Sequence, residues 1–448
     1  MAMKRWLPGL AALPICALPV IWAGQRAPVL PASVILITLD TTRADHLPPY
    51  DDGVELPAIE QLAREGVVFE RAIAPVPLTL PSHSSLFTGR IPPAHGARVN
   101  GLTLEAGLPM FPERLQAAGY RTAAFVGSMV LNGNRGLRRG FDVYDDIDVG
   151  PGARLRRPAN EVIDGAIDWV NAGRDRPFFL WVHLYDAHAP HVLPPEFDGA
   201  SADERYAAAI GFMDSQIARL LQALDERQEL ARTAIIVTAD HGESLGDHGE
   251  RGHGIFVYES ALRVPLIVRW PGIEPRRVPD LVQLIDLAPT ILALEGLDAP
   301  PMDGASLAPV LRGRPAGGRT GYAESMFPLQ YGWSALRTVR DNRFKLIEAP
   351  RPELYDLATD PHELQNLYDT HPAVAGRLEA KLRTFGPVNW QAAPAQPEAV
   401  RDQLASLGYV SPSRGPAPTA PPAIWLDPKD MIGVYNDIVE QRMRQRER

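Results

Sequence analysis

Three short apolar runs, each followed by an acidic residue, constrain the fold of this chain most strongly. Residues 33–39 (SVILITL), 177–184 (PFFLWVHL) and 234–238 (AIIVT) lack Asp, Glu, Lys and Arg and are rich in β-branched and aromatic side chains. Continuous apolar runs of this length indicate strands buried on both faces, as in a parallel sheet. Helical spacing over residues 160–172 and 206–224 separates the runs. The alternation predicts an α/β fold with helices on both faces of the sheet.

Acidic clusters follow these runs, at the point where each predicted strand ends. They contain Asp40, Asp186 with His188, and Asp240 with His241. In open α/β sheets, ligands gather at the carboxyl ends of strands. Carboxylates together with imidazole suit zinc, manganese or magnesium, or calcium where oxygens dominate. We therefore predict a metal site, although any single Asp here could instead cap the next helix.

The stretch 77–90 (PLTLPSHSSLFTGR) joins hydroxyl side chains, an imidazole and a proline to a helix-forming run. Proline favours the first turn of a helix and small hydroxyl residues favour its cap, so Thr79 is predicted to lie just before a helix N-terminus. Backbone N–H groups and the helix dipole favour an anion there. Taken alone, the pattern is more typical of a simple helix cap.

Two further histidines, His248 and His253, lie in the glycine-rich loop 246–254. A solvated loop histidine is the plain interpretation of each, and we keep it for His248. For His253, a role in the site is the alternative.

The net charge argues against a nucleic-acid partner, and the N-terminal segment indicates an exported protein. The formal net charge is −9, which argues against nucleic acid as a main ligand. Residues 1–24 hold a short positive region, an apolar stretch and Ala23-Gly24 as a small-residue cleavage site, so we expect a signal peptide. An uncleaved membrane anchor is the alternative, although the apolar run is short for a span. The expected location is periplasmic or extracellular.

The C-terminal third contains short runs of alternating polar and apolar residues instead of long apolar runs. Residues 281–294 are predicted to be helical, but 334–339 and 343–347 are short alternating runs joined by Asp341-Asn342, which favours a hairpin turn. These runs predict a small antiparallel sheet.

We divide the chain into five parts on these patterns. They are a signal peptide or N-terminal anchor (1–24), a large α/β domain (30–318), a subdomain with the small sheet (319–410), a proline-rich linker (411–425) and an amphipathic helix (426–448). The helix has a basic end. Its apolar face is expected to pack on the body or to make a peripheral contact with a partner protein or a membrane.

Five motifs occur in a fixed order: DTTRADH (40–46), LPSHSSLFTG (80–89), DHGE (240–243), YES with RVPLIV (258–268) and ELYDLATDP (353–361). Together they resemble the sulfatase family of the alkaline phosphatase superfamily, and in particular its exported bacterial members. The resemblance covers about residues 33–410. It implies an alkaline-phosphatase-like sandwich with a mainly parallel central sheet flanked by helices, and a small C-terminal antiparallel sheet.

The resemblance also implies which residues bind the metal and react. Asp40, Asp240 and His241 match the family's metal ligands. Thr79 falls at the nucleophile position of the family's Cys/Ser-x-Pro-Ser-Arg pattern, where it would also contact the metal. A divalent zinc, calcium, manganese or magnesium ion is expected.

Other positions are expected to contact the substrate. His188 and His253 lie where family members place a histidine and a lysine that hold substrate oxygens, and we expect Arg43 and His83 to contact the substrate as well. Asp186 could join His188 and His253 in binding a second metal, or these groups could donate hydrogen bonds. One metal site is therefore expected, with a second left open.

Three departures from the family pattern bear on the chemistry. Thr79 cannot become formylglycine as Cys or Ser does, His83 replaces the usual arginine, and Thr41 replaces an aspartate often found beside the first ligand. A threonine ester has no second hydroxyl with which to expel sulfate, so water must cleave it at sulfur or phosphorus. Superfamily relatives with threonine nucleophiles act on phosphodiesters or transfer phospho-groups.

The expected function is therefore metal-dependent hydrolysis of a sulfate ester or, because of Thr79, of a phosphate ester or diester, without formylglycine. The substrate would be an anionic ester of a small molecule, glycan or lipid. A phospho-group transferase acting on an envelope lipid or glycan is one alternative. A non-catalytic binding module that retains the fold is the other.

Overall fold

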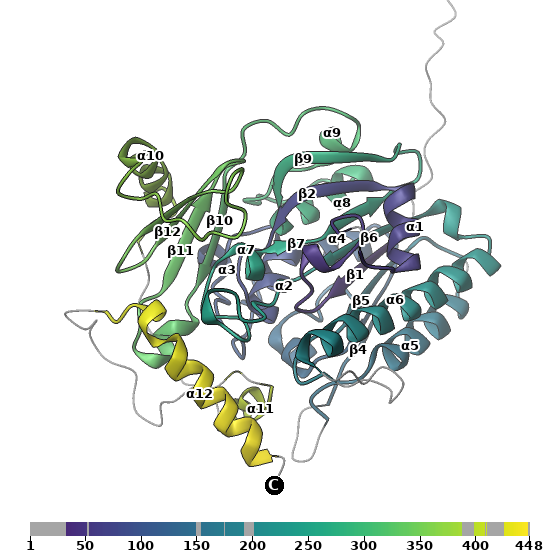
Figure 1. Cartoon of the computed structure of the whole chain (residues 1–448). Helices are drawn as coiled ribbons and strands as arrows, with labels where there is room; N and C mark the ends of the chain where they lie inside the picture. Colours follow the sequence, from purple (N-terminus) through teal and green to yellow (C-terminus); the bar gives the residue numbers. More distant parts are fainter. Residues whose placement is uncertain are drawn as a thin grey trace, which may run out of the picture. The chain divides into compact units, whose positions relative to one another are not determined.

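The computed structural model describes residues 33–51, 53–148, 154–173, 175–191, 201–387, 398–407, 409 and 425–446. The expected signal segment and nearly all of the linker lie outside these residues. A nine-stranded sheet has the strand order β4-β3-β5-β1-β6-β8-β2-β7, with β9 paired to β2 (Figure 1). The three predicted strands are parallel neighbours at its centre: β5 (Phe178–Leu184), β1 (Ser33–Leu39) and β6 (Thr233–Ala239).

Strand β1 shows why these runs are apolar throughout. Val34 and Leu36 belong to one apolar core, whereas Ile35 and Ile37 belong to another, and all four side chains are fully buried. Successive side chains of a strand point to opposite faces of the sheet. A strand covered on both faces therefore has no position that favours a polar side chain.

Helices cover both faces of the sheet. Those packed in one core are α1 (Pro57–Glu65), α5 (Ala159–Asn171) and α6 (Ala202–Glu226). Those packed in the other are α2 (Thr79–Thr88), α4 (Phe111–Ala117) and α8 (Leu287–Leu294). Figure 1 shows α5 and α6 side by side. The predicted α/β architecture, mainly parallel and flanked by helices, is confirmed.

The predicted helix over 281–294 is wrong in its first part. Residues Leu281 to Gln283 end strand β9 (Arg276–Gln283), which pairs in parallel with β2 (Val67–Ile73), and α8 begins only at Leu287. Leu281 and Val282 are fully buried beside β2. Tertiary pairing therefore decides the conformation of a short apolar run that fits helix and strand equally well.

Shorter elements complete this part of the chain. They are β3 (Arg121–Val126), β4 (Val143–Asp145), β7 (Arg263–Val264), β8 (Leu266–Arg269), α3 (Pro92–His95), α7 (Glu259–Leu262) and α9 (Ala308–Leu311). Pro265 separates β7 from β8, since proline has no N–H for the strand ladder.

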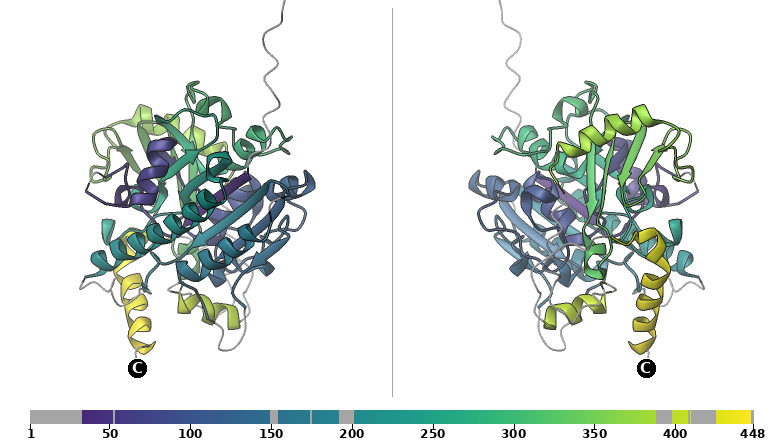
Figure 2. Two further views of the ribbon diagram at one scale, coloured as in Figure 1. Left: turned by 90° about the vertical axis from the view of Figure 1, so that its right-hand side faces the viewer. Right: turned by 90° about the vertical axis from the view of Figure 1, so that its left-hand side faces the viewer.

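A four-stranded antiparallel sheet follows, as predicted. Its strands, in spatial order, are β10 (Gly321–Ser325), β11 (Leu336–Arg340), β12 (Phe344–Glu348) and β13 (Glu353–Asp356). The turn at Asp341-Asn342 joins β11 to β12, and the Asp341 carboxylate accepts the N–H groups of Arg343 and Phe344. Helix α10 (Pro372–Arg383) packs on this sheet (Figure 2).

Two C-terminal helices pack against the body of the large domain. They are α11 (Glu398–Ser406) and α12 (Pro428–Arg446). Leu404 of α11 and Tyr435 of α12 are buried in the same apolar core as α2 and α8. Within the described ranges, no helix combines the length and apolar character that a membrane crossing needs.

Candidate active site

The carboxyl ends of β1 and β6 bring two aspartates together. Asp40 directly follows β1, Asp240 directly follows β6, and both side chains are fully buried. Because the strands are parallel and Leu39 is in register with Ala239, their ends coincide. One ligand atom from each of Asp40, Asp240 and His241 lies within 4.8 Å of the other two.

These aspartates lack positive partners. Asp40 Oδ1 and Asp240 Oδ2 are buried and accept no hydrogen bond from the described residues. Their ion-pair partners, among those same residues, are all histidines. Burial raises the pKa of Asp40 to about 7 and also raises the pKa of Asp240. The unpaired oxygens and the mixed oxygen and nitrogen donors fit a divalent cation.

Backbone contacts fix the orientation of the ligands. The N–H groups of Thr41 and His241 donate to Asp240 Oδ1 at 3.2 and 2.9 Å, which leaves Oδ2 for the cluster. Thr41 has a φ of 52°, a strained value for a β-branched residue. His241 Nδ1 donates to the Gly242 carbonyl at 2.9 Å. Since a carbonyl only accepts, Nε2 of His241 keeps its lone pair for a cation.

Thr79 is the first residue of α2 and is fully buried. Its hydroxyl lies 3.4 Å from Nε2 of His241. The positive end of the helix dipole lies at this point, where the Leu80 N–H already donates to Asn100 at 3.0 Å. The hydroxyl therefore has a candidate metal ligand, His241, on one side and an anion-favouring helix end on the other.

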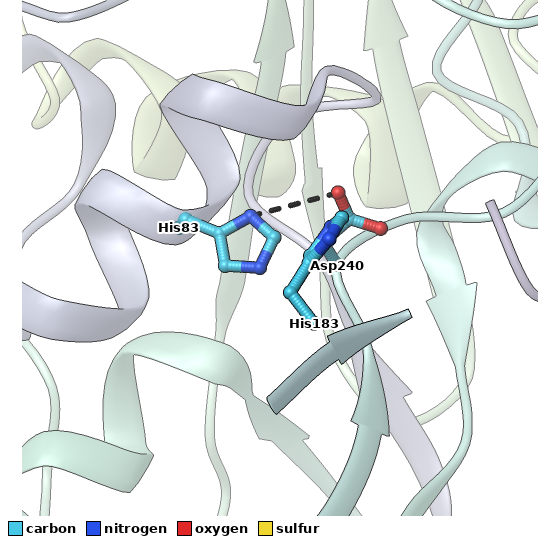
Figure 3. Close-up of side chains that lie close together, drawn as sticks. All are labelled: His83, His183 and Asp240. Carbon is cyan, nitrogen blue, oxygen red and sulfur yellow. Dashed lines mark ion pairs between the residues drawn. The ribbon is translucent and has the colours of Figure 1, made fainter. Parts of the chain in front are cut away.

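His83 lies one turn further along α2 and faces Asp240 (Figure 3). Its Nδ1 donates to the Thr79 carbonyl at 2.8 Å, so its Nε2 accepts from the Thr38 hydroxyl at 3.1 Å. Trp181 donates to that same hydroxyl at 2.9 Å. Burial lowers the pKa of His83 to about 3. This geometry favours a neutral residue that holds the turn carrying Thr79, and it differs from the expected contact with substrate.

A second group of ligand-type atoms comprises His83, His183 and Asp240, again within 4.8 Å of one another. His183 lies close to His83 and Asp240 (Figure 3), and its Nε2 is 3.1 Å from Asp40 Oδ2. Both nitrogens of His83 are already hydrogen-bonded. The group therefore surrounds the candidate metal-ligand aspartates with a neighbouring layer of hydrogen bonds.

Three polar side chains converge on the hydroxyl of Tyr409, which the sequence did not single out. The Tyr409 oxygen lies 3.2 Å from Thr79 Oγ1, 3.0 Å from His188 Nε2 and 3.2 Å from His253 Nε2. His188 Nδ1 donates to the Ala189 carbonyl at 2.6 Å, so its Nε2 is an acceptor. His188, His253 and the Thr79 hydroxyl therefore all lie within hydrogen-bond distance of the same point, the Tyr409 oxygen.

Glu243 is a second residue that sequence reasoning missed. Its carboxyl oxygen lies 3.2 Å from Nδ1 of His253. Burial raises the pKa of Glu243 to about 8 and lowers the pKa of His253 to about 4. At neutral pH the acid form of Glu243 therefore donates to Nδ1, and Nε2 of His253 carries the proton. The only signal in the sequence was the place of Glu243 in the DHGE motif.

Two expected site residues have other surroundings. Asp186 accepts the Ala159 N–H at 3.0 Å and so caps α5. Arg43 pairs with Asp45 and Asp247 at 2.7 and 2.8 Å, which ties the loop after β1 to the loop after β6. The geometry favours structural roles for both. A residue at a strand end can face the ligand or the next helix, and the sequence pattern is the same in either case.

Comparisons with known proteins match most of this chain. A family model described as Sulfatase matches residues 32–297, and a second, described as N-sulphoglucosamine sulphohydrolase, C-terminal, matches residues 246–385. Steryl-sulfatase of Mus musculus is 28% identical over 423 residues, covering 66% of this chain and 68% of its own. The uncharacterized sulfatase YidJ of Escherichia coli is 25% identical over 387 residues, covering 69% of this chain and 78% of its own.

Solved structures share the fold. The phosphonate monoester hydrolase of Agrobacterium radiobacter has a TM-score of 0.68 at 22% identity, covering 79% of this chain and 95% of that one. The phosphonate monoester hydrolase of Silicibacter pomeroyi has a TM-score of 0.69 at 22% identity, covering 81% and 97%. A protein in complex with its substrate D-glucosamine-2-N,6-O-disulfate has a TM-score of 0.68 at 21% identity, covering 79% and 97%.

Proposed function

Because this chain belongs to the sulfatase family of the alkaline phosphatase superfamily and is a sulfatase-like ester hydrolase, we propose that it cleaves a phosphodiester or a phosphonate monoester through a covalent intermediate on Thr79. One observation carries the proposal. A threonine hydroxyl, which cannot become formylglycine, stands at the N-terminus of α2, 3.4 Å from Nε2 of His241, a member of the group that includes Asp40.

The sulfatase family is generally metal-dependent, and this chain offers a matching donor set. Asp40, Asp240 and His241 would hold a divalent zinc, calcium, manganese or magnesium ion, with the Thr79 hydroxyl as a further ligand. Such an ion lowers the pKa of a bound hydroxyl and offsets charge on the transferred group.

The charge of the site favours an ester with a single negative charge. His83 and His253 occupy positions where the family pattern has arginine and lysine. Burial lowers the pKa of His83 to about 3 and that of His253 to about 4, so both are neutral in the free protein. Phosphodiesters, phosphonate monoesters and sulfate esters carry one negative charge at the reacting group, whereas a phosphate monoester carries about two at neutral pH.

The histidine pair supplies proton transfers in the first step. The Thr79 oxygen attacks phosphorus while its proton passes to Nε2 of His188. The bond from phosphorus to the leaving oxygen breaks, and that oxygen takes the Nε2 proton of His253. Glu243 then gives its proton to Nδ1 of His253.

The second step restores the site. Water attacks phosphorus and gives a proton to Nε2 of His253, and the Nδ1 proton returns to Glu243. The bond between phosphorus and the Thr79 oxygen breaks, and that oxygen recovers its proton from His188. The same residues therefore act as acid and base in turn.

A sulfate ester is the second candidate, because the family model and the curated relatives are sulfatases. A structural neighbour is bound to a sulfated glucosamine, which supports an anionic glycan as leaving group, whereas two neighbours are phosphonate monoester hydrolases. Transfer of the phospho-group to an alcohol on an envelope lipid or glycan is a variant in which that alcohol replaces water in the second step. Export through residues 1–24 is part of this proposal.

The test is a panel of 4-nitrophenyl esters: sulfate, phosphate monoester, phosphodiester and phosphonate monoester. We expect the highest kcat/KM for the phosphodiester or the phosphonate. Thr79→Ala should abolish turnover without changing the bound metal, Thr79→Ser should retain part of it, and Thr88→Ala, at the other end of α2, should behave as wild type. Turnover by Thr79→Ala would rule out the nucleophile, and a preference for the sulfate would select the second candidate.

A further inference from the structure

A cavity of about 170 Å³ lies beside His188 and His253. Its apolar walls include Leu407, Tyr409, Tyr435 and Val439, and polar side chains of Glu243, Arg251, Asn436 and Glu440 also line it. Tyr409 thus lines the cavity with its ring, while its hydroxyl reaches the two histidines and the nucleophile.

The Tyr409 hydroxyl is held as a bound ligand oxygen would be held. Its oxygen lies 3.0 Å from Nε2 of His188, to which it donates, and 3.2 Å from both the hydroxyl of Thr79 and Nε2 of His253. In the proposed reaction, Thr79 attacks phosphorus and His253 protonates the leaving oxygen, so the reacting group of the ester must lie among the same three groups. An ester oxygen and the Tyr409 oxygen cannot occupy this position together.

The size and lining of the cavity indicate what joins that oxygen. Leu407, Tyr409 and Tyr435 are buried in the apolar core, and Val439 packs against it. A dry cavity of about 150 Å³ in another protein binds benzene. The cavity of about 170 Å³ therefore suits one apolar ring, in addition to the volume that the Tyr409 ring itself occupies.

We propose that Leu407, Tyr409 and α12 form the leaving-group subsite of this enzyme. The subsite takes a ring-sized apolar alcohol such as a phenol. Tyr409 occupies the subsite until an ester displaces it. The inference rests on the proposed function, because it identifies the leaving group of that reaction. It assigns a role to a segment that lies over 300 residues from the nucleophile, with a separation of 330 between Thr79 and Tyr409.

Kinetics with two esters of the same phosphonate, phenyl and methyl, test the displacement. Removing the hydrogen bonds that hold Tyr409 lowers the free-energy cost of displacing it. We expect Tyr409→Ala to raise kcat/KM for the phenyl ester about tenfold and for the methyl ester less. Tyr409→Phe should raise both modestly, and Tyr368→Phe, whose hydroxyl pairs with Glu379 on the surface, is the matched control. A fall in kcat/KM for Tyr409→Phe, or equal gains for the two esters, would overturn the proposal.

Phenol binding provides a measurement that needs no turnover. By calorimetry, phenol should bind Tyr409→Ala with a dissociation constant in the millimolar range, compete with the phenyl ester, and bind neither wild type nor Tyr409→Ala combined with Val439→Trp. Absence of phenol binding to Tyr409→Ala overturns the subsite, even where Thr79-dependent turnover stands. Phenol binding without ester turnover by any variant would support the subsite and reject the proposed function.

Discussion

Two clusters of buried carboxyl groups in this molecule differ in how their charge is compensated. Glu259 and Glu363, near the small sheet, pair with Lys345 at 3.2 and 2.8 Å, and Glu259 also pairs with Arg340. Asp40 and Asp240, at the ends of β1 and β6, pair only with histidines among the described residues.

The pKa values follow that difference. Burial alone would raise the pKa of Glu259, but Arg340 and Lys345 outweigh it and hold that pKa below its usual range. Burial raises the pKa of Glu363, which shares Lys345 with Glu259. Burial also raises the pKa of both Asp40 and Asp240, where no lysine or arginine opposes it. Lysine and arginine side chains of the protein compensate the charge of Glu259 and Glu363, whereas Asp40 and Asp240 are suited to binding a metal cation.

The largest expected effect separates the two clusters by metal content. Asp240→Asn removes a ligand charge, so the purified protein should lose its divalent cation, as measured by mass spectrometry of the metal. Loss of several kcal/mol of transition-state stabilisation should lower kcat/KM by about 10³-fold or more.

Glu259→Gln is the matched control for this variant, since it also neutralises one buried carboxylate. It should lose stability but keep the metal bound per folded molecule. Equal metal content in Asp240→Asn and wild type would show that the two clusters do not differ as we infer.

The next effect concerns the self-compensated cluster. Lys345 is fully buried, and Lys345→Met would leave Glu259 paired with Arg340 and Glu363 without an ion-pair partner among the described residues. Removing one partner of a buried ion pair costs about 3–5 kcal/mol. Urea denaturation should show a loss of this size in the free energy of unfolding. Arg154→Met, which breaks an exposed pair with Glu161, should change it little, and an equally small loss for Lys345→Met would contradict the comparison.

A smaller effect should accompany addition of the cation. A ligand at 100 times its dissociation constant stabilises the folded state by about 2.7 kcal/mol. Chelator-treated wild type and Glu259→Gln should both gain this amount when the metal is restored, as followed by thermal unfolding. Asp240→Asn should gain almost nothing. A gain in all three proteins would place the cation elsewhere.

The smallest effect comes from a buried base that belongs to neither cluster. Burial lowers the pKa of His95 to about 3, and its neutral ring donates to Ser85 and accepts from the Ala97 N–H. Below about pH 6.5, the ordinary pKa of histidine, His95 binds a proton in the unfolded chain but stays neutral in the folded protein. Stability should therefore fall with decreasing pH, by about 2 kcal/mol at pH 5 through this residue.

His95→Gln keeps a neutral donor for Ser85 but cannot titrate. Comparing the free energy of unfolding at pH 7 and pH 5 cancels the intrinsic cost of the substitution, so the variant should lose about 2 kcal/mol less than wild type on acidification. Equal acid losses in the two proteins would show that His95 is not held neutral by burial.

Much of the fold could be predicted from local pattern. The run 33–39 is strand β1 residue for residue, and Thr79, predicted to lie just before a helix N-terminus, is the first residue of α2, with Leu78 at the cap. The prediction was wrong over 281–283, where a short apolar run pairs with β2 instead of starting a helix. Such a run has no periodicity long enough to distinguish strand from helix, so its neighbours decide.

The candidate site shows the same division. An aspartate directly after a buried strand is visible in the sequence, and so Asp40 and Asp240 could be placed at one sheet edge. Arg43 and Asp186 have the same local signature, but they pair with Asp45 and Asp247 and with the start of α5. Local sequence specifies the position of a residue along the sheet edge, but not the direction in which its side chain points.

By itself, the sequence determined the family through its ordered motifs. It also determined the α/β sheet and the pair of aspartates that meet at its edge, because hydrophobic period and chain direction are local properties. Only the tertiary structure decided that Glu243 supports His253 and that Tyr409 stands against Thr79, 330 positions away. Contacts at such separations depend on how whole elements pack, and packing complementarity leaves no pattern in a short stretch of sequence.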